Sequence, residues 1–361
     1  MATPLKEYYN KDFVRRLAAA LRKKDTSFDS AGFEKFVFDK SWKDRELKQR
    51  VRHISQSLHK FLPYLYKKQV DLLRAVAAEF KGLEAFVFPD FIEVYGLDDL
   101  QTSVKAMEEF TTYSTSEFAV RPFIIRYEKP MMKQMTAWAK SKNEHHRRLA
   151  SEGCRPRLPW AMALPGFKKN PAPVLPVLEL LKNDESEYVR RSVANNLNDI
   201  AKDHPQLALE TGKKWLGKSP ETDRLVKHAL RTLLKKGNRE ALALFGHGNH
   251  DHAEIHDLKL DSTGIRIGEN LGFSFSVSHS EKKVSKLRLE YAVYFMKANG
   301  KQSKKIFKIS ENSFEGGKKF TYKRTHRFRD FTTRVHYPGE HVIAVVVNGE
   351  EKARKKFLLK K

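Results

Sequence analysis

The stretch DESEYVRRSVANNLNDIAKDHP (184–205) carries the complete pattern of one amphipathic helix. Asp184 is expected to cap this helix, and Glu187, three residues later, to complete a capping box. His204-Pro205 is expected to end it, because proline disfavours helical backbone in the residue before it. One face carries an apolar stripe at helical spacing, formed by Val189, Val193, Leu197 and Ile200. The sequence therefore predicts a helix that buries this stripe.

The opposite face of the same helix is unusually rich in arginine and amide side chains. It is expected to be exposed and holds Arg191, Asn195, Asn198, Asp199 and Lys202. Such a face can bind phosphates through Arg190 and Arg191 and keep one carboxylate beside them. It can equally be an ordinary solvated face with local ion pairs.

The same layout recurs in four segments of the chain. They are TSEFAVRPFI (115–124), NEHHRRLASE (143–152), SEYVRRSVAN (186–195) and TDRLVKHALR (222–231). Each segment has an acid near a predicted helix start and a basic residue four positions later: Glu117/Arg121, Glu144/Arg148, Glu187/Arg191 and Asp223/Lys227. Offsets of roughly thirty to forty residues are typical of HEAT-type helical pairs, which stack into a solenoid with one long concave surface. Repeated basic residues would line that surface with positive charge.

An aromatic segment and a proline are unusual features of the predicted helical region. Residues 85–97 (AFVFPDFIEVYGL) are rich in aromatic side chains but are expected to form a helical connection. Pro122 is expected to kink the helix that Ser116 and Glu117 begin, because proline inside a helix removes a hydrogen bond.

The pattern changes near His247. The segment GHGNHDHAEIHD (246–257) resembles an interdomain linker, and its histidines fit no standard zinc spacing, so no metal site is expected. Short alternating runs follow, separated by turn signals such as Asn348-Gly349, which predicts an all-β, immunoglobulin-like sandwich of about seven strands. The predicted organisation is a helical repeat domain over 1–246, a linker over 247–257 and a sandwich over 258–361.

The composition restricts the classes of function. The 361 residues carry a formal net charge of +25, which favours a polyanion as partner, with nucleic acid before a membrane surface. No segment has the length and apolarity of a membrane span, and the first residues lack the apolar core of a signal peptide. The single cysteine, Cys154, is typical of a reducing cytosol and is expected to be a small buried residue.

The sequence contains no phosphate-binding loop, dinucleotide fingerprint, HExxH motif or nucleophile elbow. Chemistry must therefore come from carboxylates of the helical surface, and the candidates are Glu117, Glu152 and Asp199. Trp160 lies close to Glu152, in the proline-rich segment 155–173. This segment either packs over the junction of two repeats or presents an aromatic ring to the groove.

The segments TSEFAVRPFI, NEHHRRLASEGCRPRLPWAMALP and SEYVRRSVANNLNDIAKDHP together resemble the AlkC branch of the HEAT-like DNA alkylation repair glycosylases. The resemblance extends across 1–246, and the C-terminal sandwich is similar to the immunoglobulin-like domain of some AlkC proteins. It implies a monofunctional glycosylase that excises cationic bases such as N3-methyladenine and N3-methylcytosine from duplex DNA. It also implies a cytoplasmic, nucleoid-associated monomer that needs no metal or other cofactor.

The resemblance also implies roles for individual residues. Asp199, Glu152 and Glu117 would be catalytic, and Trp160 would contact the base. The residues expected to bind DNA are Arg121, Arg148, Arg155, Arg190, Arg191 and Lys202. Because an alkylated base is already cationic, the enzyme needs negative charge near the sugar and a positioned water, not a general acid.

A different class of function is a non-catalytic HEAT-type scaffold that binds nucleic acid or an acidic protein. Such a scaffold has no use for acids in a basic groove, because they weaken phosphate binding. The sandwich is expected to act as a second DNA clamp. Residues 251–361 hold 24 lysines and arginines against 13 acids, an excess of +11, with clusters at 323–329 and 352–356.

Overall fold

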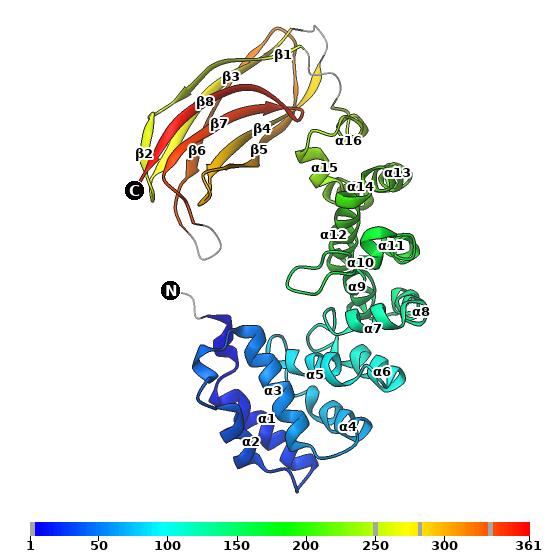
Figure 1. Ribbon diagram of the computed structural model, residues 1–361. Coiled ribbons are helices and arrows are strands. Elements are labelled where there is room, and N and C mark those ends of the chain that lie inside the picture. Colours follow the sequence, from blue (N-terminus) through cyan, green and yellow to red (C-terminus); the bar gives the residue numbers. More distant parts are fainter. Residues whose placement is uncertain (1–3, 248–251, 281–283, 331–334) are drawn as a thin grey trace. The chain divides into compact units, whose positions relative to one another are not determined.

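The computed structural model describes residues 4–247, 252–280, 284–330 and 335–361 (Figure 1). An α-helical repeat region is followed by a β-sandwich, which confirms the predicted fold class. The chain forms two compact units, Met1–Ala208 with Lys214–Ala229 and Leu209–Lys213 with Leu230–Lys361. None of the helices in the described ranges is long and apolar enough to cross a membrane.

The described helices account for most of the chain up to His247. They are α1 (Lys11–Lys24), α2 (Ser30–Val37), α3 (Leu47–Phe61), α4 (Tyr66–Ala77), α5 (Val87–Tyr95), α6 (Leu100–Phe110), α7 (Val120–Arg126), α8 (Glu128–Ala139), α9 (Glu144–Gly153), α10 (Pro165–Lys169), α11 (Leu175–Leu181), α12 (Glu187–Asp203), α13 (Pro205–Trp215), α14 (Pro220–Ala229), α15 (Arg231–Lys235) and α16 (Arg239–Leu244). Short 3-10 helices η1 (Leu5–Tyr8), η2 (Trp42–Asp44) and η3 (Glu84–Phe86) connect some of them. The aromatic segment 85–97 is helical, as predicted, because it forms η3 and α5.

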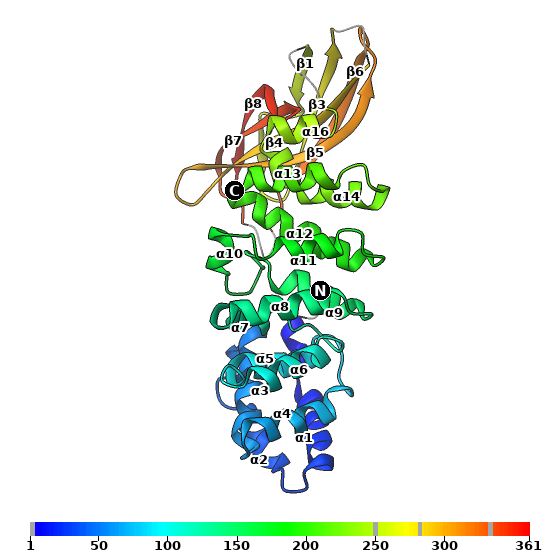
Figure 2. The ribbon, with the colours of Figure 1, turned by 90° about the vertical axis from the view of Figure 1, so that its right-hand side faces the viewer.

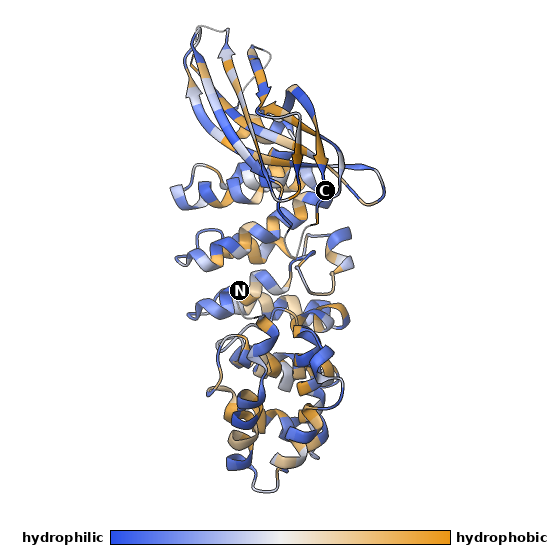
Figure 3. Ribbon diagram, turned by 90° about the vertical axis from the view of Figure 1, so that its left-hand side faces the viewer, coloured by the Kyte–Doolittle hydropathy of each residue, from blue (hydrophilic) through white to orange (hydrophobic). Residues whose placement is uncertain are grey.

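Helices of the first unit lie in two rows (Figures 1 and 2). One row contains α3, α5, α9, α12 and α14, with contacts α3–α5, α9–α12 and α12–α14, and the other contains α4, α6, α8 and α11, with contacts α4–α6 and α8–α11. Hydrophobic and hydrophilic residues lie on different sides of these helices (Figure 3). Three of the four repeated segments therefore fall on helices of one row, α9, α12 and α14, and the fourth runs into α7.

Helix α12 ends and buries its apolar stripe as predicted, but it begins differently. It ends at Asp203, as His204-Pro205 predicts, and its apolar stripe is buried. The predicted capping box at its start is wrong, because the N-cap residue is Ser186. The Asp184 carboxylate instead accepts hydrogen bonds from the Ser186 amide at 2.9 Å and from Nε of Arg147 at 2.7 Å. It therefore joins α12 to α9 of the preceding repeat.

The predicted kink at Pro122 is also wrong. Helix α7 begins at Val120, so Pro122 lies in its first turn. Backbone amides in a first turn have no partner within the helix, and proline is tolerated there without bending the axis.

The β-sandwich of the second unit consists of two sheets. Its strands are β1 (Ala253–Leu260), β2 (Gly264–Arg266), β3 (Asn270–His279), β4 (Ser285–Met296), β5 (Gln302–Phe314), β6 (Lys319–Arg327), β7 (Gly339–Val347) and β8 (Glu350–Lys360). One sheet has the order β1-β3-β6 and the other β2-β8-β7-β4-β5. The described residues thus form eight strands where about seven were predicted, and β1 starts inside the segment interpreted as a linker.

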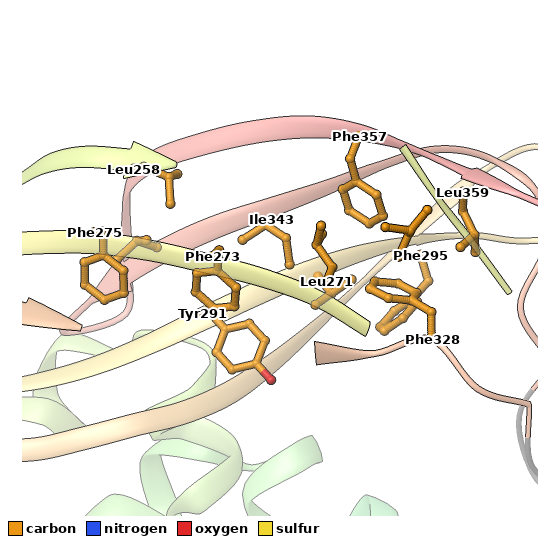
Figure 4. Close-up of a cluster of buried hydrophobic side chains, with 13 residues drawn as sticks. Leu258, Leu271, Phe273, Phe275, Tyr291, Phe295, Phe328, Ile343, Phe357 and Leu359 are labelled. Carbon is orange, nitrogen blue, oxygen red and sulfur yellow. The ribbon is translucent and has the colours of Figure 1, made fainter. Parts of the chain in front are cut away.

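A hydrophobic core lies between the two sheets (Figure 4). Phe273 and Tyr291 come from different sheets, and their ring centroids lie 5.1 Å apart. The β7–β8 turn is made by Asn348 and Gly349, both with positive φ, as the Asn-Gly signal predicts. Alternation along the strands therefore places one face of each sheet in the core.

Helices α15 and α16 belong to the same compact unit as the sandwich. The backbone of Gly237, two residues after the end of α15, approaches Gly349 so closely that a Cβ atom on Gly349 would lie 2.1 Å from Cα of Gly237. After α16, Nε2 of His247 lies 3.0 Å from Oε1 of Glu311 on β5. These contacts attach the last two helices to the β7–β8 turn and to strand β5.

Candidate active site

Six charged side chains of the first unit form one continuous network of alternating sign. In spatial order they are Glu117, Arg148, Glu152, Arg155, Asp199 and Lys202. Glu117 precedes α7, the next three come from α9 and the residue pair after it, and the last two come from α12. The network therefore joins three successive repeats, and it contains all three carboxylates that the sequence singles out.

Arg148 occupies the end of the network nearest α7. Its Nη1 atom lies 2.6 Å from Oε2 of Glu117 and donates to the Thr115 hydroxyl at 3.0 Å. Its Nη2 atom lies 3.7 Å from Oε1 of Glu152, one helical turn later on α9. The sequence pattern paired Glu117 with Arg121, but the structure pairs it with an arginine of the next repeat.

Asp199 occupies the other end and is buried, with 1% of its surface exposed. Its Oδ2 atom accepts from Nε of Arg155 at 2.9 Å, and its Oδ1 atom accepts from Nζ of Lys202 at 2.8 Å. The prediction that Asp199 and Asn198 are exposed is wrong, because α12 packs against both α9 and α14. Two cations therefore compensate the charge of this carboxylate.

Arg155 is a buried part of this network. Its Nη1 atom donates to Glu152 at 2.6 Å, while its Nε atom donates to Asp199. Burial alone would lower the pKa of its guanidinium, but the two carboxylates raise it above the usual value. The prediction that Arg155 contacts DNA does not fit this arrangement, since its donors face carboxylates inside the protein.

Arg121 is fully buried, so a direct contact with DNA is excluded in this conformation. Its Nε atom donates to the Met162 carbonyl at 2.6 Å, and its Nη1 atom donates to the Gly153 carbonyl at 3.0 Å. Burial lowers the pKa of the guanidinium to about 10. Arg121 thus connects the end of α9 with the loop that follows it.

That loop, between α9 and α10, presents Trp160 to solvent. It projects from the row that contains α9 and α12 (Figure 1). Trp160 is 69% exposed and has a φ of 65°, whereas Leu158 of the same loop is buried. Nζ of Lys48 on α3 donates to the Trp160 carbonyl at 2.7 Å. Leu158 is therefore buried, while the Trp160 side chain is exposed to solvent.

The remaining residues predicted to bind DNA differ in their exposure and in their partners within the protein. Arg190 donates through Nη1 to the carbonyls of Asp184 and Glu185, at 2.6 and 2.8 Å. The side chain of Arg191 is exposed and forms no hydrogen bond or ion pair with the described part of the chain. Both arginines line a cavity of about 200 Å³ between α12 and α14, together with Arg224 and other residues. Lys202 is exposed, although it pairs with Asp199.

Tyr188 is a residue of this site that the sequence interpretation missed. Its ring centroid lies 4.9 Å from Cζ of Arg148, and the side chain is 43% exposed. Burial of its hydroxyl raises the pKa of Tyr188. The available signal was an aromatic residue in the first turn of α12, next to the apolar stripe but not part of it.

Two other predictions concern reactive or metal-binding groups. Cys154 is buried, as predicted, and burial raises the pKa of its thiol to about 12. Of the histidine-rich segment, His250 and Asp251 lie outside the described residues. Within the described ranges, no three histidine, cysteine or acidic side chains are arranged to hold a metal ion.

Comparisons with known proteins agree with this fold and with the resemblance. Residues 254–361 match the family described as "Uncharacterised protein YhaZ, C-terminal Ig-like domain". The chain is 48% identical over 348 residues to "Uncharacterized protein YhaZ" of Bacillus subtilis (strain 168), which covers 96% of this chain and 97% of that protein. It also matches the Pseudomonas fluorescens alkylpurine DNA glycosylase AlkC, solved bound to DNA containing an abasic site analog. That match has a TM-score of 0.95 and 37% identity, and covers 99% of this chain and 100% of the other. The chain therefore belongs to the AlkC-type family of DNA alkylation repair glycosylases with a C-terminal immunoglobulin-like domain.

Proposed function

We propose that the chain is a monofunctional glycosylase that hydrolyses the N-glycosidic bond of cationic alkylated bases in duplex DNA. N3-methyladenine and N3-methylcytosine are the proposed lesions. The Pseudomonas fluorescens relative is an alkylpurine DNA glycosylase and was solved with DNA, which supports both the reaction class and the partner. The observation that carries the proposal is the network that gathers three carboxylates from three repeats, together with an exposed indole on the loop that follows α9.

The chemistry of the lesion explains why carboxylates suffice. An N3-alkylated base carries a positive charge and leaves as a neutral molecule, so it requires no protonation. Positive charge then develops on the deoxyribose as the bond breaks, and a fixed carboxylate stabilises that charge strongly where water is excluded. Asp199 is held by Arg155 and Lys202, so it needs little reorganisation when the reaction occurs.

The three acids have different proposed tasks. Asp199 stabilises the oxocarbenium-like sugar, and Glu152 orients the attacking water. Arg155 and Arg148 both contact Oε1 of Glu152, so Oε2 is left for the water. Glu117 supports Glu152 through their shared partner Arg148. Trp160 contacts the cationic base with the electron-rich face of its indole, an interaction worth about 1–2 kcal/mol when desolvated.

DNA binding is assigned to cations that can reach a phosphate. Arg191 and Lys202 are exposed on α12, and Arg190 and Arg148 are partly exposed beside them. The sandwich is proposed to add a second set of phosphate contacts through its positive edge. A cytoplasmic monomer that associates with the nucleoid is the proposed state of the protein.

A single-turnover assay tests the proposal. The full chain, in excess over methylated duplex DNA, should release N3-methyladenine, and the abasic strand should stay intact until it is treated with alkali. Glu152→Gln and Asp199→Asn should each slow the release by about tenfold or more. Tight DNA binding without any base release would instead support a non-catalytic scaffold. Strand cleavage without alkali would contradict the monofunctional assignment.

A further inference from the structure

We propose that Lys48 is a positioning residue for base excision, because its ammonium group holds the loop that carries Trp160. Lys48 lies in the first turn of α3, outside the charged network of the candidate active site. The inference rests on the proposed function and deepens it, since it gives a helix near the start of the chain a task in the reaction. Lys48 acts through the Trp160 backbone and not by contact with the lesion.

The ammonium group of Lys48 adjoins two segments that carry proposed site residues. Its Nζ atom donates to the Trp160 carbonyl at 2.7 Å, although the two residues are 112 positions apart in the chain. The same atom lies 5.0 Å from the centroid of the Phe118 ring, within the distance at which an aromatic face attracts a cation. Phe118 directly follows Glu117. One cation of α3 therefore joins the segment before α7 to the loop after α9.

The direction of the indole depends on the backbone of this loop. The Trp160 side chain is 69% exposed, so packing alone does little to fix it. Arg121 of α7 donates to the Met162 carbonyl at 2.6 Å and anchors the loop two residues later. The Trp160 carbonyl is the acceptor of Lys48. Two cations, from α3 and from α7, thus hold the loop on either side of residue 161.

The conformation of Trp160 makes the bond from Lys48 important. Its φ of 65° lies in the left-handed region, where a residue with a large side chain is strained. Such a conformation persists only where the surrounding structure imposes it. A hydrogen bond from a charged donor is about twice as strong as one between neutral groups. Without the ammonium group, the residue is free to relax to a negative φ, which turns the indole in another direction.

Lys60 on the same helix provides a matched comparison. It is exposed, and its Nζ atom lies 4.5 Å from the centroid of the Phe36 ring. Its side chain forms no hydrogen bond or ion pair with the described residues. The two lysines therefore share their charge, their helix and a contact with an aromatic ring. They differ in the bond to the Trp160 loop, so Lys60→Met controls for the loss of one positive charge.

The first experiment observes the indole directly in the free protein. The full chain, with its four tryptophans replaced by 5-fluorotryptophan, gives a ¹⁹F spectrum in which Trp160→Phe identifies the Trp160 resonance. Lys48→Met keeps an unbranched side chain but removes the donor, so it should shift or broaden that resonance. Lys60→Met should leave it in place. A Trp160 resonance that is unchanged in Lys48→Met would overturn the proposal.

The second experiment measures excision of N3-methyladenine at saturating enzyme. Lys48→Met should release the base about tenfold more slowly, because the indole is misplaced. Lys48→Arg keeps a charged donor and should stay within about threefold of the parent, and Lys60→Met should match the parent. Affinity for undamaged duplex should fall no further in Lys48→Met than in Lys60→Met. A larger fall would assign Lys48 to a phosphate contact and overturn the positioning role.

A double-mutant cycle tests whether Lys48 acts through Trp160. In the Trp160→Ala background, Lys48→Met should cause no further loss of excision, whereas losses that multiply would mean that the two residues act independently. A parent that releases no alkylated base refutes the proposed function, and the ¹⁹F spectrum then decides by itself whether Lys48 holds the loop. An active parent with an unchanged resonance and multiplying losses refutes the Lys48 assignment alone.

Discussion

The Nε atom of Arg155 lies 2.9 Å from Oδ2 of Asp199, so a residue just after α9 holds a carboxylate near the C-terminal end of α12. Both side chains are buried, and a buried carboxylate keeps its charge only where it is paired and hydrogen-bonded. The contact therefore fixes a negative charge at the junction of two repeats. It also couples the chemistry of the site to the stability of that junction.

Replacement of Asp199 by asparagine should affect both activity and stability. Asn keeps the shape and one acceptor, but Arg155 loses a charged partner, so the free energy of unfolding should fall by about 1–3 kcal/mol. Excision of N3-methyladenine should slow by at least about tenfold. Denaturant unfolding followed by tryptophan fluorescence and single-turnover excision below the melting transition measure the two effects.

Asp203→Asn is the matched control for this prediction. Asp203 lies one turn later on α12 and pairs with Nε of Arg157 at 2.9 Å, but the pair is partly exposed. Its loss should cost less than about 1 kcal/mol and leave excision unchanged. If Asp199→Asn excises at the parental rate while it is folded, Asp199 is structural and the proposed mechanism fails.

The sequence predicted local features of this site well, because local features depend on spacing. The end of α12 at Asp203, its buried stripe and the concentration of acids near the repeated helices all follow from residue order. The charge partners did not follow, because they depend on how helices of different repeats pack. Glu117 meets Arg148 and not Arg121, and Asp199 is buried because α12 packs against both α9 and α14.

The same distinction holds for the rest of the fold. Turn residues and alternation predicted the sandwich, because strand register leaves a period of two in the sequence. Strand β1 was missed in part because its histidines and acids hide that period. The role of Arg121 could not be predicted either, since its two carbonyl partners, Gly153 and Met162, lie 32 and 41 residues away in the chain.

Trp160→Gly should separate the role of the indole from backbone strain. A bulky residue with a φ of 65° is strained, whereas glycine adopts this conformation freely. The variant should therefore melt at or above the temperature of Trp160→Ala, which loses the ring but keeps the strain. Both variants should lose preference for a cationic lesion and retain affinity for undamaged duplex. An equal loss of affinity for damaged and undamaged DNA would indicate that the indole only supports the loop.

Arg121→Met should impair excision without changing the electrostatics of DNA binding. Met fills a similar volume, but the Gly153 and Met162 carbonyls lose their donors, so the free energy of unfolding should fall by about 1–3 kcal/mol. The loop that carries Trp160 loses its hydrogen bond at Met162, so excision should slow while the salt dependence of duplex binding stays constant. Arg191→Gln is the control, because loss of one phosphate contact should reduce the slope of log affinity against log salt by about 0.9. A reduced slope in Arg121→Met would mean that Arg121 reaches DNA in the complex.

The sandwich should lose stability as the pH falls below about 6.5. Burial lowers the pKa of His341, which packs against Phe357, and it also lowers the pKa of His247. Below a pH of about 6.5, these histidines bind protons more readily in the unfolded state than in the folded state. The free energy of unfolding therefore falls as the pH decreases below this value. Hydrogen exchange of peptides from β7, measured between pH 5.5 and 7.5, should show faster opening at low pH. His341→Phe keeps the ring and should weaken this dependence; an unchanged dependence would assign it to other groups.

The proposed DNA clamp of the sandwich is best tested by charge substitutions in the full chain. Lys323, Arg327 and Arg329 are exposed on or just after β6, an edge strand, and form no side-chain ion pair with the described residues. By contrast, Lys352 and Lys356 of β8 already pair with acids, each at 3.0 Å. A truncation near Gly246 is a poorer test, because α15 and α16 belong to the sandwich unit.

The triple variant Lys323→Gln, Arg327→Gln, Arg329→Gln should bind duplex DNA with a shallower salt dependence. Each lost phosphate contact should reduce the slope by about 0.9, whereas Lys352→Gln with Lys356→Gln should reduce it less, because those cations are partly neutralised. Excision at saturating enzyme should change less than affinity, since the acids of the helical unit remain in place. A salt titration of binding and a single-turnover assay at saturation provide the two readings. An unchanged slope would remove the clamp, and abolished excision at saturation would mean that the sandwich helps to shape the DNA at the lesion.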